Sequence, residues 1–200
     1  MEIIHFDWNS LTFSFLVTLA FSIAGTFGLW DQTKKILLHK SGRSVANIVF
    51  ISGFFLYIAS GIYGFQIQSM ALELSSVIRG PWHIPIVIGL FKYKGFTKWE
   101  KNTCYILAGL CILLFLTQWD LLFLLVTGVV VLPAALQPYG MWKEKKRGVV
   151  SVGLFSIYAI SAAFWTVYAL AIDNYIIFTF SLISSLIFGL TVLLYFIYKN

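Results

Sequence analysis

The amino-acid sequence predicts an all-α integral membrane protein whose seven transmembrane helices form two parallel three-helix repeats joined by a linker helix. Three observations support this fold class. The 200 residues are 60% hydrophobic and 11% charged, whereas soluble domains contain about 25% charged residues. Seven apolar stretches approach the roughly 20 residues that a helix needs to cross a bilayer. Residues 11–95 also align with residues 116–200 without a gap.

The predicted spans follow the apolar runs and are separated by short polar segments. They cover residues 11–35, 45–66, 69–92, 103–118, 121–142, 149–171 and 175–197. The fourth span is short, and only Gln118-Trp119-Asp120 separates it from the fifth. We therefore divide the chain into a first repeat (1–95), a linker helix (96–118) and a second repeat (119–200).

The internal repeat depends on polar residues that recur at one spacing. Three of them recur 105 residues later, as the pairs Gln32/Gln137, Tyr63/Tyr168 and Ser76/Ser181. An internal duplication in a membrane protein is typical of a transporter with its site between the two copies. Because each repeat has three spans, the linker helix restores the direction of the second repeat, so the two repeats run parallel.

The basic residues predict the orientation in the membrane. Every Lys and Arg except Arg79 lies at the end of the first, third or fifth span, in the loop after it, or at the end of the chain. The opposite side carries the acidic residues Glu2, Asp7, Asp120 and Asp173. Since Lys and Arg are retained in the cytoplasm, we expect a multi-pass protein with its N-terminus outside and its C-terminus cytoplasmic. The short final tail and the lack of an Asn-x-Ser/Thr sequon favour a prokaryotic cell membrane.

The placement of charges argues against nucleic-acid binding and against catalysis. The formal net charge is +6, but the basic residues lie in short loops and not on one face of a folded domain. The sequence has no His, Asp and Glu cluster with metal-ligand spacing and no glycine-rich phosphate loop. We therefore expect no enzyme, metal or cofactor. The expected partners are the lipid bilayer and a small-molecule solute, and a homo-oligomer stays open.

Two segments resemble a known transporter superfamily. "DQTKKILLHKSGRSV" and "LQPYGMWKEKKRGVV" each have a Gln, a short amphipathic turn and basic residues before the next span. This pattern and the order of three helices, a linker and three helices resemble the SWEET, SemiSWEET and PQ-loop superfamily. Asp31 and Leu136 replace the family's Pro before each Gln. The resemblance implies a transporter of a small, sugar-like solute that works by alternating access through a central site between the repeats.

The resemblance also implies which residues bind the solute. In "FWTVYALAIDNYIIFTFS", Trp165 and Ser181 occupy the positions of a family Trp and Asn that line the cavity. Ser60 and Ser76 occupy the same positions in the first repeat. Ser replaces both Asn residues and one Trp, which weakens the case for a sugar. Each serine is alternatively a small residue that permits close helix packing.

The third predicted span is unusual because it carries ionisable residues. Ser76, Arg79 and His83 have the spacing i, i+3, i+7, which places them on one helical stripe. If Ser76 faces the solute, Arg79 and His83 face it too, so Arg79 joins the predicted solute-binding residues. The second repeat has Ser184 and Phe188 at the positions of Arg79 and His83. The two copies therefore differ where the charge lies.

Two roles for Arg79 stay open. It contacts an anionic group of the solute through a bidentate bond, or it pairs structurally with Asp31 or Glu73. The candidates for gating or coupling are Asp31, Gln32, Glu73, His83 and Gln137. A proton carrier among Asp31, Glu73 and His83 would couple transport to protons, but facilitated diffusion is the default because no ion site is evident.

Two alternative functions also fit the sequence. The same fold could transport a ring-bearing solute, such as a nucleoside, a vitamin or an amino acid, which an aromatic content of 18% would suit. A non-transporting receptor of the KDEL-receptor type would instead bind a peptide tail, with Arg79 on its carboxylate. Solute flux into liposomes separates a transporter from such a receptor.

Overall fold

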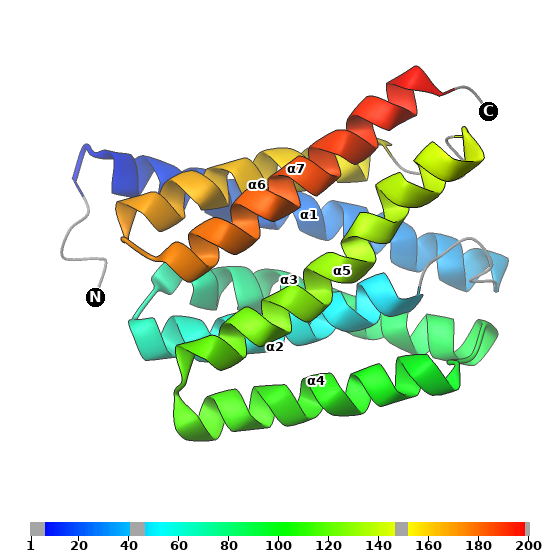
Figure 1. Ribbon diagram of the computed structural model, residues 1–200, viewed down its shortest axis with the longest axis horizontal. Coiled ribbons are helices and arrows are strands. Elements are labelled where there is room, and N and C mark those ends of the chain that lie inside the picture. Colours follow the sequence, from blue (N-terminus) through cyan, green and yellow to red (C-terminus); the bar gives the residue numbers. More distant parts are fainter. Residues whose placement is uncertain (1–6, 41–46, 147–151, 199–200) are drawn as a thin grey trace. The chain divides into compact units, whose positions relative to one another are not determined.

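The computed structural model describes residues 7–40, 47–146 and 152–198, and every regular element among them is an α-helix (Figure 1). The helices are α1 (Ser10–His39), α2 (Asn47–Ile67), α3 (Met70–Tyr93), α4 (Lys98–Thr117), α5 (Asp120–Glu144), α6 (Val152–Ala171) and α7 (Tyr175–Ile197). All seven are long and apolar enough to cross a membrane. The predicted all-α class and the predicted number of spans are confirmed.

The helices belong to two compact units. The first is Ser22–Val130, which holds most of α1, all of α2, α3 and α4, and the start of α5. Among the described residues, the second unit comprises 7–21, 131–146 and 152–198. Helices α1 and α5 each contribute to both units, so these bounds differ from the repeats drawn from the sequence, which stay a prediction.

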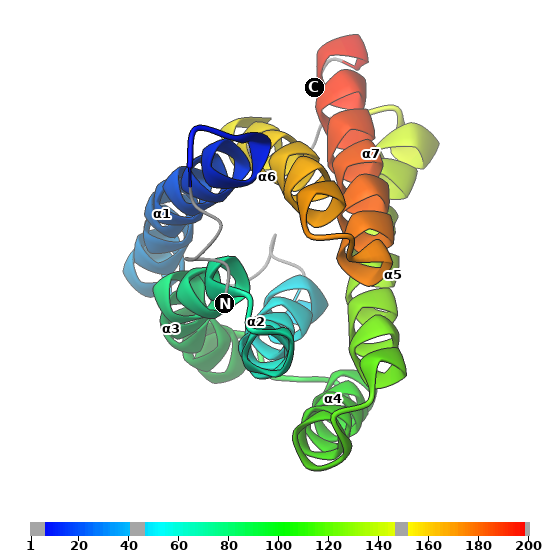
Figure 2. The same ribbon diagram turned by 90° about the vertical axis from the view of Figure 1, so that its left-hand side faces the viewer.

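In the first unit α3 packs between the later turns of α1 and helix α2 (Figure 2). A core cluster joins the three helices through Leu29 and Ile36 of α1, Phe50 of α2, and Ile86 and Leu90 of α3. These side chains are at most 9% exposed. Burial of apolar side chains adds little inside a bilayer, so close packing and hydrogen bonds hold these helices together.

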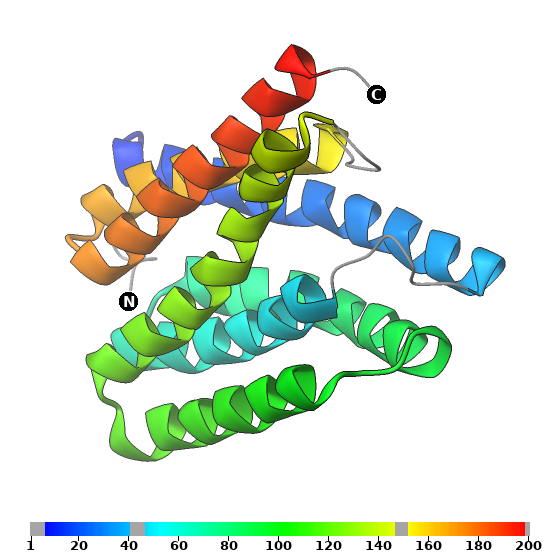
Figure 3. The same cartoon turned by 45° about the vertical axis from the view of Figure 1, so that its right-hand side comes forward.

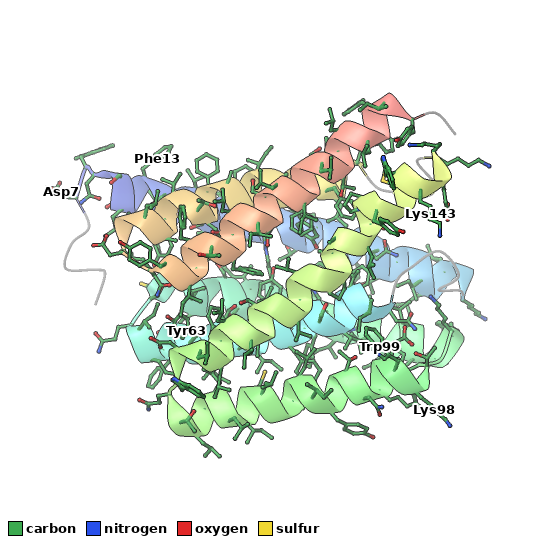
Figure 4. All side chains as sticks on the ribbon, in the orientation of Figure 1. Asp7, Phe13, Tyr63, Lys98, Trp99 and Lys143 are labelled. Atoms are coloured by element: carbon green, nitrogen blue, oxygen red, sulfur yellow. The ribbon has the colours of Figure 1, made fainter. Side chains whose placement is uncertain are left out.

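Within the first unit, helix α4 and the start of α5 both pack on α2. Helix α4 packs along α2 (Figure 3), and the Gln66 side-chain amide donates a hydrogen bond of 2.8 Å to the Leu114 carbonyl. Tyr63, labelled in Figure 4, stacks on Phe123 of α5 with ring centroids 4.2 Å apart. The buried tyrosine of α2 therefore serves as packing surface for the start of α5.

The linker helix α4 begins at Lys98, five residues before the predicted span. Thr97 accepts a bond from the Glu100 backbone N–H, and the Glu100 carboxylate accepts one from the Thr97 backbone N–H. This capping box satisfies two donors at the helix start. Lys98 and Trp99 therefore lie in the first turn of α4 (Figure 4).

In the second unit α6 packs along α7. The Ser185 hydroxyl on α7 donates to the Ala159 carbonyl on α6 at 3.2 Å. Phe164 of α6 stacks on Phe21 of α1 with centroids 5.7 Å apart and meets Phe13 edge to face at 6.3 Å. The first turns of α1 thus pack on α6 through aromatic rings.

Helix ends recur in the structure at the spacing seen in the sequence. Left-handed backbone recurs as the pairs Lys40/Lys145 and Gln68/Asp173, each 105 residues apart. Ser69 caps the start of α3 and Asn174 caps the start of α7, each by accepting a backbone N–H three residues further on. A common residue spacing for turns, caps and helix starts supports the internal repeat.

Candidate functional site

The predicted polar stripe of α3 is buried in the first unit. Ser76, Arg79 and His83 are 9%, 5% and 4% exposed. Their common burial agrees with the helical spacing that places them on one face. An ionisable residue within a membrane span is costly, so it faces protein or water and commonly marks a functional site.

The Arg79 guanidinium joins three helices of the first unit. Its Nε–H donates to the Ser22 carbonyl of α1 at 3.0 Å, and Nη1 donates to the Tyr57 hydroxyl of α2 at 3.1 Å. Hydrogen bonds from a charged donor are stronger than those between neutral groups. Arg79 therefore fixes α3 to both neighbouring helices at one point.

A glycine on α1 makes room for this arginine. A Cβ added at Gly25 would lie 2.8 Å from both Nε and Nη2 of Arg79. That distance is well inside van der Waals contact, so any side chain there would displace the guanidinium. Gly25 is needed because the Arg79 side chain lies directly on the backbone of α1.

A second glycine makes room for the histidine. A Cβ at Gly53 of α2 would lie 2.8 Å from Nε2 of His83. His83 Nδ1 lies 3.2 Å from the Arg79 carbonyl, and its ring centroid is 5.1 Å from that of Tyr57. Arg79, His83 and Tyr57 therefore form one polar cluster between α2 and α3.

The first-repeat serines flank this cluster. Ser60 is 8% exposed and follows Tyr57 by one turn of α2. The Ser76 hydroxyl donates to the Leu72 carbonyl of its own helix at 2.7 Å. A Cβ at Gly61 would lie 3.4 Å from the Ser76 Cβ, which means that α2 and α3 approach closely here. Ser60 and Ser76 thus lie on the packed faces of these helices.

The second unit brings together the other two predicted solute-binding positions. The Ser181 hydroxyl donates to the Ile177 carbonyl at 2.6 Å and accepts from the Thr166 hydroxyl at 3.1 Å. Trp165 is half-buried and meets Tyr168 edge to face, with centroids 5.4 Å apart. Trp165 and Ser181 therefore lie on the paired helices α6 and α7, with Thr166 as the polar link.

The predicted gating or coupling residues lie on three helices. Asp31 is exposed and Gln32 half-buried on α1, while Gln137 is half-buried on α5. Glu73 lies half-buried in the first turn of α3, about 9 Å along the helix axis from Arg79. Their roles stay predictions. Among the described residues, no three His, Cys, Asp or Glu side chains are grouped so that they could hold a metal ion.

Sequence reasoning missed the residues that surround Arg79 and His83. They are Ser22, Gly25, Gly53 and Tyr57. A signal was present, because the positions 105 residues after Gly25 and Gly53 carry Val130 and Tyr158. The glycines change together with the two ionisable residues that they accommodate.

Comparison with known proteins identifies the fold. No family model matches the sequence, and no curated protein sequence matches it either. The 3.7 Å structure of a eukaryotic SWEET transporter superposes with a TM-score of 0.66 at 14% sequence identity. The match covers 94% of this chain and 96% of that chain. The seven-helix chain therefore has the fold of a SWEET transporter, as the resemblance of its sequence implied.

Proposed function

We propose that the protein is a membrane transporter that moves a small, polar, sugar-like solute. The observation that carries this proposal is the full-length similarity in fold to a transporter, which covers nearly all of both chains. The polar groups buried in the spans support it, since such groups are costly in a bilayer unless they serve a purpose.

The chemistry of the candidate positions fits a hydroxylated solute. Ser60, Ser76 and Ser181 carry hydroxyls that both donate and accept hydrogen bonds. Trp165 offers an indole ring on which the apolar face of a small ring can stack, plus one N–H donor. These groups match a solute with many hydroxyls on a compact carbon frame.

Transport would proceed by alternating access, the mechanism that repeat-built transporters commonly use. We infer facilitated diffusion, in which the solute gradient alone sets the direction of flux. Uptake that responds to an imposed pH gradient at constant solute gradient would instead indicate proton coupling.

We infer a membrane orientation with the N-terminus outside and the C-terminus in the cytoplasm. The described basic residues other than Arg79 support it, because they cluster at the ends of α1, α3 and α5 and at the start of α4, and Lys and Arg are retained in the cytoplasm. Reporter domains fused to either end would test it. A reporter that functions only in the cytoplasm should be active at the C-terminus and inactive at the N-terminus.

The decisive experiment is flux into liposomes. We test uptake of radiolabelled D-glucose, sucrose, uridine and an amino acid by purified protein in proteoliposomes. Uptake of D-glucose or sucrose should be faster than in protein-free liposomes, with saturation and counterflow. Saturable uptake of uridine or the amino acid alone would support transport but show that the solute is not sugar-like. Absence of flux together with binding of a peptide tail would replace the transporter with a receptor.

A matched pair of variants connects flux to the candidate site. Trp165→Ala should lower the uptake rate at least about tenfold if the indole stacks on the solute. Trp119→Ala removes a side chain that is 57% exposed at the α4–α5 turn and should leave uptake within about twofold. Equal effects of the two substitutions on the uptake rate would mean that Trp165 does not contact the solute.

A further inference from the structure

The position of the Arg79 guanidinium limits what it can bind. The side chain is 5% exposed, and its Nε and Nη2 atoms lie against the backbone of α1 at Gly25. Its Nε–H is used by the Ser22 carbonyl. A solute would have to displace packed helix backbone to form a bidentate bond with this group.

Tyr57 is the more accessible residue of the same pair. Tyr57 is half-buried on α2, and its oxygen is 3.1 Å from Arg79 Nη1. A guanidinium has donors and no acceptor, so the phenol must accept this bond. The proton of the Tyr57 hydroxyl is therefore directed away from Arg79. No acceptor within the described part of the chain receives it.

Arg79 also changes the strength of that donor. Accepting a hydrogen bond from a charged group polarises the phenol, and hydrogen bonds in a chain strengthen one another. The His83 ring, 5.1 Å away, packs beside the Tyr57 ring and restricts its rotation. The result is a fixed and polarised O–H donor.

The donor lies next to a predicted solute-binding position and is specific to one repeat. Tyr57 and Ser60 have the spacing i, i+3, so they share a stripe of α2. The residue 105 positions after Tyr57 is Ala162, and the residue 105 positions after Arg79 is Ser184. The phenol–guanidinium pair therefore has no counterpart in the second repeat.

We propose that the Tyr57 hydroxyl is a specificity-determining donor to the solute, and that Arg79 is a positioning residue that acts through it. This inference rests on the proposed transport function and deepens it. In this proposal the first repeat binds a hydroxyl or carbonyl acceptor of a neutral solute. The solute therefore needs no anionic group.

The test measures D-glucose uptake by Tyr57→Phe in proteoliposomes, because this substitution removes the hydroxyl and keeps the ring. We expect KM to rise about three- to tenfold, the loss of one hydrogen bond, while the maximal rate changes less than about twofold. Tyr105→Phe, at a 75% exposed position of α4, should leave both unchanged. An unchanged KM in Tyr57→Phe would overturn the proposal.

A double-mutant cycle tests the positioning role. Arg79→Gln should raise KM in the wild-type background and change it by less than about twofold in the Tyr57→Phe background, because coupled residues are not additive. Additive effects would mean that Arg79 acts without Tyr57. If Arg79→Gln does not fold, monodeoxy-glucose derivatives give an independent readout. One of them should lose affinity for the wild type but not for Tyr57→Phe, and equal losses with both proteins would contradict the proposal.

Failure of this inference is distinguishable from failure of the proposed function. Wild-type protein that transports none of the solutes rejects the transporter and this inference with it. Wild-type uptake of D-glucose with an unaltered KM in Tyr57→Phe rejects only the role of the phenol. Wild-type uptake of glucuronate without uptake of D-glucose would instead return the solute contact to Arg79.

Discussion

The two repeats agree at their helix ends and differ in their buried cores. Turns, caps and helix starts recur 105 residues apart, but the first repeat buries Arg79 and His83 where the second has Ser184 and Phe188. Helix ends depend on a few local hydrogen bonds, which each copy retains independently. A buried side chain depends on its neighbours on other helices, so changing it requires those neighbours to change as well.

One contact shows this dependence in both copies. In the first repeat, His83 lies against Gly53 so closely that a Cβ there would be 2.8 Å from its ring. At the equivalent positions of the second repeat, Phe188 packs on Tyr158 with ring centroids 5.5 Å apart. In the first repeat the small Gly53 faces the His83 ring, whereas in the second repeat the Tyr158 ring faces the Phe188 ring. Each pair fills its space only as a pair.

The largest effect should follow from replacing Gly25 of α1 with Val, the residue at the equivalent position 130 of the second repeat. Gly25→Val places a side chain on the Arg79 guanidinium and breaks its bond to the Ser22 carbonyl. We expect a loss of about 3 kcal/mol or more in the free energy of unfolding, because a hydrogen bond from a charged group contributes about 1.5–3 kcal/mol and overpacking costs about 1–3 kcal/mol. The measurement is unfolding in mixed micelles followed by tryptophan fluorescence.

The control for that experiment is Gly109→Val. A Cβ at Gly109 meets no described atom within 4 Å, so the change tests helix propensity and bulk alone and should alter stability by less than about 1 kcal/mol. Equal losses from the two substitutions would show that the arginine does not depend on the glycine.

A smaller effect, and a change of sign, should appear at the histidine. Gly53→Ala forces a methyl group onto the His83 ring, and overpacking costs about 1–3 kcal/mol. In a His83→Ala background the clash is gone, and the same substitution should stabilise the protein because Ala favours helix over Gly by about 1 kcal/mol. If Gly53→Ala changed stability equally in both backgrounds, its effect would not depend on the His83 ring.

The helix caps should respond alike in both repeats. Asn174→Ala removes an acceptor 3.0 Å from the Ile177 backbone N–H and should cost about 1 kcal/mol. Ser69→Ala removes a longer bond of 3.4 Å to Leu72 and should cost somewhat less. Thermal unfolding midpoints of the two variants give the ranking, and a larger loss for Ser69→Ala would contradict it.

The smallest effect should come from the hydroxyl pair of the second repeat. Thr166→Val removes the bond to Ser181, and polar contacts between membrane helices average about 0.6 kcal/mol. Thr166 also donates to the Ala162 carbonyl of its own helix at 2.9 Å. Thr117→Val is the matched control, because Thr117 likewise donates to its own helix, at the Leu113 carbonyl, but is exposed. A loss no greater than that of the control would show that the Ser181 contact adds nothing.

Sequence reasoning predicted the features that depend on local pattern. Seven spans follow from apolar runs, and the common burial of Ser76, Arg79 and His83 follows from helical periodicity. The start of α4 was predicted five residues late, although the Thr97-x-x-Glu100 capping pattern is visible in the sequence. Hydropathy alone sets this boundary too late, because Lys98 and Lys101 lower the apolar average of the first turn.

The surroundings of Arg79 could not be predicted in the same way. Ser22 and Tyr57 lie on other helices, and no pattern within one helix gives the distance to the next. Comparing the two repeats supplies part of that information, since Gly25 and Gly53 differ in the second repeat just as the Arg79 and His83 that they accommodate do. The solute-binding roles of Ser60, Trp165 and Ser181 stay predictions that flux measurements must test.

The fit of Gly25 to Arg79 also constrains how the two halves can have diverged. A side chain at position 25 forces the end of the Arg79 side chain to shift and so breaks its bond to the Ser22 carbonyl. In either historical direction, a path on which glycine is present whenever arginine is present avoids this less stable intermediate. The order of the two substitutions therefore sets the stability of the sequences that lie between the two cores.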